Sequence, residues 1–181
     1  YESAEIHSMS MEYLTWPWME LFFGENANKF KYSALKGALT FIPYGVTIDH
    51  FQHYVYENPN ATPEERRKKY HKLELIYKPD LDYDNDFYDS GAFWFAQGHV
   101  FWAPFYYIDY TLAQVCAFQY LLKYLDNKEE TLKEYITLCK AGGSESFFDL
   151  IEVGKLKNPM NTNILEEIAP KLEELLKNIE V

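Results

Sequence analysis

The start of the chain, YESAEIHSMSMEYLTWPW, combines carboxylates and an imidazole with small and apolar residues. Glu5 and Glu12 stand about two helical turns apart, so a helix here carries both carboxylates on one side. The apolar neighbours predict that much of this helix is buried, and a buried carboxylate is costly unless it is paired or binds a metal. These glutamates are therefore candidate metal ligands, although spacing alone favours pairing with Lys or Arg elsewhere. Glu2 and His7 receive no role.

A histidine followed by tyrosines forms a second candidate group. His99 precedes a predicted helix, and Tyr107 and Tyr110 are three residues apart, so they share one face of that helix. Tyrosine hydroxyls and a histidine N–H can donate hydrogen bonds to an oxyanion without first losing a proton. The chain contains 16 Tyr, however, and most of them must be packing residues whose hydroxyls find a partner.

Two other stretches resemble metal sites less closely. Asp49, His50 and His53 lie within one predicted helix. His50 and His53 (i, i+3) or Asp49 and His53 (i, i+4) could there bind one metal ion together. Polar packing on a helix face is the favoured interpretation of these residues. The acidic loop at 78–86 offers oxygen ligands, but it lacks the mid-loop glycine and the closing glutamate of a calcium-binding EF-hand.

The composition is that of one globular domain. The 181 residues are 48% hydrophobic and 18% aromatic, which excludes a disordered chain. The net charge of −11, with no basic block interleaved with aromatic residues, argues against nucleic acid and against an anionic membrane surface as partners. No apolar run is long enough to span a bilayer. Cys116 and Cys139 lie in apolar helical patterns, which favours a reducing, cytoplasmic location.

The elements that position these groups are predicted to be helices, and the fold class is all-α. Thr62, Pro63 and Glu65 form a strong helix start, with a capping box. No alternating strand pattern and no internal repeat is present. Helices are predicted over residues 5–23 (kinked near 16–18), 33–56 (bent near Pro43), 63–77, 104–125, 129–140, 146–153 and 164–179.

The string from Glu2 to Leu14, followed by Trp16-Pro17-Trp18, resembles a segment of the oligoendopeptidase F and thimet oligopeptidase family of zinc metallopeptidases. In that family an upstream helix with a His-Glu-x-x-His motif supplies two zinc ligands and a general base. The resemblance implies that Glu5 is the third ligand of one zinc ion and that Glu12 supports this site from the same helix.

Gly98-His99-Val100-Phe101 and the run from Pro104 to Tyr110 are similar to the segment of the same family that faces the zinc across the substrate cleft. The resemblance implies that His99 and Tyr106 bind substrate, and that Tyr107 or Tyr110 stabilises the tetrahedral intermediate. Residues 54–59 and 139–144 continue the family pattern, so the resemblance covers nearly the whole chain. His50 stands where the family usually has an acidic residue, which argues against a required ligand at this position.

No His-Glu-x-x-His occurs in the sequence. The resemblance therefore implies that residues 1–181 form, as a single unit, the C-terminal segment of a catalytic domain whose histidine helix lies upstream. The expected function is hydrolysis of short peptides by the complete zinc oligopeptidase, with oligopeptides and the remaining N-terminal part as partners. One carboxylate is a poor zinc site, so the ion can be absent from this chain, which alone is expected to be inactive. The alternative is a non-catalytic helical binding or scaffold module descended from such a peptidase.

Overall fold

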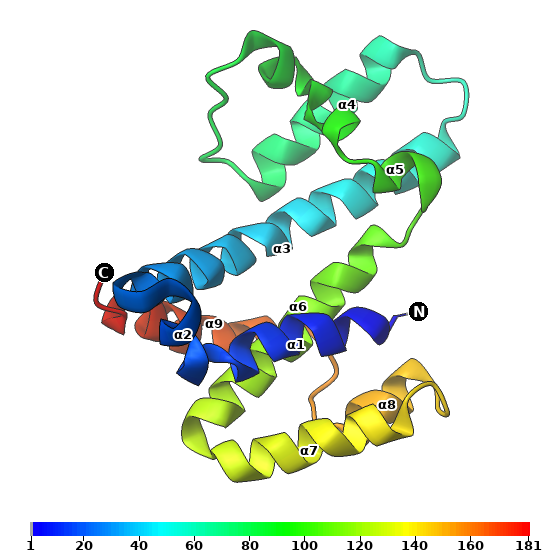
Figure 1. Cartoon of the computed structure of the whole chain (residues 1–181). Coiled ribbons are helices and arrows are strands. Elements are labelled where there is room, and N and C mark those ends of the chain that lie inside the picture. Colours follow the sequence, from blue (N-terminus) through cyan, green and yellow to red (C-terminus); the bar gives the residue numbers. More distant parts are fainter. Residues whose placement is uncertain (1) are drawn as a thin grey trace. The chain divides into compact units, whose positions relative to one another are not determined.

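The computed structural model describes residues 2–181, and every regular element in that range is helical (Figure 1). The predicted all-α class is confirmed. The contacts divide the chain into two compact units: a first unit ending at Leu39 and resuming over Leu112–Val181, and a second unit over Thr40–Thr111. The elements in chain order are α1 (Ala4–Leu14), η1 (Trp16–Trp18), α2 (Glu20–Phe23), η2 (Gly24–Asn26), α3 (Ala27–Glu57), α4 (Pro63–Tyr77), η3 (Tyr88–Ala92), η4 (Phe93–Ala96), α5 (His99–Trp102), α6 (Tyr107–Asp126), α7 (Lys128–Ala141), α8 (Phe147–Val153) and α9 (Thr162–Asn178).

The single kinked helix predicted over residues 5–23 is in fact divided into α1, η1 and α2. Pro17 has no backbone N–H to donate, so the helical hydrogen bonds are interrupted there. The Thr15 hydroxyl donates to the carbonyls of Met11 (2.9 Å) and Glu12 (3.0 Å), which satisfies the last turn of α1. Helix α1 therefore ends before the Trp-Pro-Trp turn.

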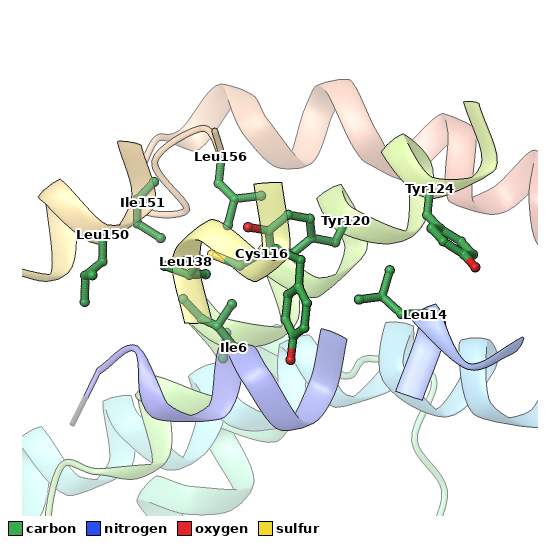
Figure 2. Packing of buried hydrophobic residues seen from close by; sticks show 11 residues of the cluster. Ile6, Leu14, Cys116, Tyr120, Tyr124, Leu138, Leu150, Ile151 and Leu156 are labelled. Atoms are coloured by element: carbon green, nitrogen blue, oxygen red, sulfur yellow. The ribbon is translucent and has the colours of Figure 1, made fainter. Parts of the chain in front are cut away.

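The core of the first unit fixes helix α1 (Figure 2). Ile6 and Leu14 pack in one cluster with side chains from α6, α7 and α8. The Tyr120 hydroxyl in this cluster donates to the carbonyl of Gly154 at 2.9 Å, and the Tyr135 hydroxyl donates to the carbonyl of His7 at 3.2 Å. The buried aromatic residues thus contribute apolar area while their polar tips stay hydrogen-bonded.

A separate core holds the second unit together. Its buried members are Ile48, Phe51, Tyr70, Leu73, Trp94 and Tyr107. The predicted capping box of α4 is present, because Thr62 accepts from the N–H of Glu65 and the Glu65 carboxylate accepts from the N–H of Thr62. Gly91 has φ of +82°, and a Cβ there would stand 2.2 Å from the carbonyl oxygen of Arg67. Close approach of η3 to α4 therefore depends on this glycine.

Candidate functional site

Helix α1 buries one face and exposes the other. Ile6, Ser10 and Leu14 are buried, whereas Glu5 is half-buried and Glu12 is exposed. The expectation that this helix is largely buried is wrong, because the helix packs through one face of an amphipathic pattern. The two carboxylates, two turns apart, share the side of α1 turned away from the core.

The Glu5 carboxylate is oriented by a neighbour on its own helix. The Ser8 hydroxyl lies 2.7 Å from Glu5 Oε2 and 3.1 Å from the Glu5 carbonyl oxygen. A hydroxyl one turn along the helix restricts the rotation of the carboxylate. The Glu12 carboxyl has a pKa raised above its ordinary value, because packing around it removes part of its hydration.

In the second unit the structure brings the predicted histidine and tyrosines together. The His99 ring lies 5.2 Å from the ring of Tyr107, 5.5 Å from that of Tyr110 and 6.4 Å from that of Tyr106, measured between centroids. The Tyr110 hydroxyl is 3.4 Å from His99 Nε2. Burial, with a smaller contribution from Tyr110, raises the pKa of Tyr107 to about 12. Its hydroxyl therefore stays protonated at neutral pH and can donate a hydrogen bond.

The chain turns sharply just before these tyrosines. The helix predicted from residue 104 begins only at Tyr107, because Phe105 adopts a left-handed backbone with φ of 62°. The N–H of Phe105 donates to Gln52 Oε1 at 2.9 Å, which ties the turn to helix α3. Tyr106 precedes the helix and Tyr107 and Tyr110 lie at its start, so the turn sets the direction from which all three approach His99.

Two functional candidates were not found by sequence reasoning. The Tyr44 hydroxyl donates to Gln97 Oε1 at 2.8 Å, and Gln97 Nε2 lies 2.6 Å from His99 Nδ1. Gln97 stands two residues before His99, which is a signal that could have been noticed. Tyr44 is distant in the sequence, and no local pattern indicates it.

Nearly the whole chain matches part of much longer peptidases of known structure. PZ peptidase A, solved with an inhibitor, is 48% identical, with a TM-score of 0.95 over 99% of this chain and 32% of that chain. A protein assigned as an oligoendopeptidase F gives 47% identity and a TM-score of 0.95, with the same shares. Another protein assigned as an oligoendopeptidase F, from Bacillus anthracis str. Ames, is 45% identical, with a TM-score of 0.84 over 99% of this chain and 29% of that chain. The chain belongs to the oligoendopeptidase F family.

The chain spans about a third of the length of those relatives. No family model matches the sequence, and no curated protein does. In the part of the chain that the structure describes, no helix is both long enough and apolar enough to cross a membrane.

The donor chemistry of Glu5 suits zinc, which accepts carboxylate oxygen beside histidine nitrogen. Among residues 2–181, no group of three or more His, Cys, Asp or Glu side chains is arranged to hold a metal ion. Glu5 and Glu12 belong to the first unit, and His99 with its tyrosines belongs to the second unit. The Glu5 carboxylate is thus a suitable donor for zinc, but the described residues alone do not form a metal site.

The rival group on α3 is occupied by local pairs. His53 Nε2 lies 3.5 Å from Asp49 Oδ2, whereas His50 Nδ1 lies 3.0 Å from the Tyr77 hydroxyl. Burial raises the pKa of the Asp49 carboxyl, and the two histidines oppose this. His50 and His53 thus have separate partners, which supports polar packing on the helix face.

Proposed function

We propose that this chain is the C-terminal part of a zinc-dependent oligopeptidase, to which it contributes one zinc ligand and the side chains that bind substrate and oxyanion. The observation that carries this proposal is the packing of His99 against Tyr107 and Tyr110, with a tyrosine hydroxyl 3.4 Å from Nε2. Membership of a family whose solved relatives are peptidases supports it.

The chemistry of these side chains suits an acyl transfer to water. When water attacks a peptide carbonyl, the oxygen gains negative charge, and donors already in place stabilise that charge without reorganisation. Tyr110 and Tyr107 offer hydroxyl protons and His99 offers a ring N–H. Tyr106, stacked on the His99 ring at 6.4 Å, would bind the extended peptide beside them.

Glu5 would hold the zinc ion together with two histidines outside this chain, and Glu12 would support that site. When bound, zinc polarises the scissile carbonyl and lowers the pKa of a coordinated water. The general base would be a glutamate outside the chain, and the partners would be oligopeptides and the N-terminal part of the same protein. A cytoplasmic location rests on the two cysteines, both of which are free thiols here.

The test uses the complete protein that contains this chain. Glu5→Gln should lower the bound zinc per protein and reduce kcat/KM at least about 100-fold, because it removes a charged ligand. Glu25→Gln, at an exposed glutamate of η2, is the matched control and should change neither quantity. Normal zinc content and normal activity in Glu5→Gln would remove Glu5 from the site. A complete protein that hydrolyses no peptide would favour the scaffold alternative.

A further inference from the structure

A series of hydrogen bonds leads from Tyr44 through Gln97 to His99 Nδ1, the ring nitrogen that does not face Tyr110. Tyr44, on α3, donates its hydroxyl proton to Gln97 Oε1 at 2.8 Å. Gln97 Nε2 in turn lies 2.6 Å from His99 Nδ1, and His99 Nε2 lies 3.4 Å from the Tyr110 hydroxyl. All four residues belong to the second unit.

The direction of these bonds determines where the His99 proton lies. The Gln97 carbonyl oxygen can only accept, and it accepts from Tyr44. The amide nitrogen of Gln97, which can only donate, is then the atom that meets Nδ1. A neutral imidazole carries one proton, so if Nδ1 accepts, the proton is on Nε2.

Packing around Tyr44 holds its hydroxyl beside the Gln97 side chain. The Tyr44 ring meets Phe93 and Tyr107 edge-on at 5.9 and 5.8 Å, and the Lys78 ammonium lies 5.1 Å from the same ring. The backbone N–H of Gln97 also donates to the Trp94 carbonyl at 3.0 Å. The Tyr44 ring and the backbone of Gln97 are thereby both held, which keeps the Tyr44 hydroxyl and the Gln97 side chain within hydrogen-bonding distance.

We propose that Gln97 is a positioning residue, which with Tyr44 holds His99 in the form whose Nε2 carries the proton. The ring then presents a donor on the side where Tyr110 lies. The opposite tautomer would present a lone pair there and would repel a developing oxyanion. The benefit to peptide hydrolysis rests on the proposed function, whereas the position of the proton does not.

The 181-residue chain, labelled with ¹⁵N at its histidine rings, tests the position of the proton directly. NMR spectra that correlate ring nitrogens with ring protons, recorded above the ordinary histidine pKa of about 6.5, should show a protonated Nε2 and an unprotonated Nδ1 for His99. A wild-type chain with the proton on Nδ1 would overturn the proposal, and this measurement needs no variant.

Gln97→Glu adds a second arm to the experiment. A carboxylate only accepts, so it should draw the proton to Nδ1 and reverse the pattern at His99. His50, bonded to Tyr77 in the same unit, is the internal reference and should keep its pattern. Asn85→Asp is the matched amide-to-carboxylate control, because Asn85 Oδ1 already accepts from two backbone N–H groups. An unchanged His99 pattern in Gln97→Glu would contradict the proposal.

Kinetics of the complete protein separate this proposal from the proposed function. Gln97→Glu should lower kcat about 10- to 100-fold with little change in KM, whereas Asn85→Asp should keep wild-type values. An active peptidase whose His99 carries its proton on Nδ1 would refute the role of Gln97 and leave the proposed function intact. An inactive complete protein with the proton on Nε2 would refute the function and leave the positioning intact.

Discussion

At the residue scale, the proposed mechanism depends most on the Tyr110 hydroxyl. Tyr110→Phe in the complete protein should lower kcat by about 10²–10³ with little change in KM, because the hydroxyl is needed mainly when the oxyanion forms. Steady-state kinetics on a short peptide measure both constants. Tyr56→Phe, at an exposed tyrosine of the same unit, should leave them unchanged. A near-normal kcat for Tyr110→Phe would remove this residue from the mechanism.

The raised pKa of the Glu12 carboxyl gives a prediction about stability and pH. The folded chain holds this proton more tightly than the unfolded chain, so Glu12 favours folding most below the ordinary carboxyl pKa of about 4.3. That contribution is lost as the pH rises through the raised pKa. Glutamine does not ionise, so the Glu12→Gln variant does not lose this contribution. The free energy of unfolding of the variant should therefore increase relative to that of wild type as the pH rises. Urea unfolding at acidic and neutral pH measures this difference, and a variant that loses relative stability on going to neutral pH would contradict it.

The limits of sequence reasoning at this scale follow from distance along the chain. His99 and the tyrosines lie within one short stretch, so the family resemblance could single them out together, and their roles stay a prediction. Gln97 lies beside them, but its role follows from a bond to Tyr44, which comes from another helix. The same holds for the exposure of Glu12, which depends on which face of α1 packs against the core.

At the scale of elements, Gly91 controls the contact between η3 and α4. Gly91→Ala places a Cβ within 2.2 Å of the Arg67 carbonyl oxygen and forces a side chain onto a left-handed backbone. The left-handed conformation alone costs about 1–2 kcal/mol, so the free energy of unfolding should fall by at least that amount. Chemical denaturation measures the change.

Gly37→Ala is the matched control for Gly91→Ala. Gly37 lies inside helix α3, and a Cβ there meets no atom within 4 Å. Alanine is favoured over glycine in a helix interior by about 1 kcal/mol, so this variant should be slightly more stable than wild type. Equal effects of the two substitutions would show that the backbone conformation at Gly91 is not what matters.

Element boundaries were predictable wherever the signal was local. Asn127 caps α7 and Ser146 caps α8 through their side chains, and both helices begin within one residue of their predicted starts. The start of α6 was predicted too early, because the turn at Phe105 depends on Gln52, which is distant in sequence. The turn η3 was not predicted, since its close approach to α4 is a tertiary contact.

At the scale of the whole molecule, two adjacent apolar side chains of α2 are unusually exposed. Leu21 is 79% exposed and Phe22 is 73% exposed. Adjacent exposed apolar residues of this size often mark an interaction surface. If the proposed function holds, the part of the complete protein that lies outside this chain covers this surface, and the solved relatives are about three times as long as this chain.

Separate expression of the two parts of the protein tests that expectation. The chain alone should hydrolyse no peptide and bind zinc at most weakly, because Glu5 is its only proposed ligand. Mixing it with the missing part should restore both zinc binding and peptide hydrolysis. Leu21 and Phe22 can be replaced together by glutamate. The concentration of the second part that is needed for restoration should then rise at least about tenfold, because two charges would have to be desolvated at the contact. Full restoration by that double variant would place the contact elsewhere, and hydrolysis by the chain alone would show that the zinc ligands were misassigned.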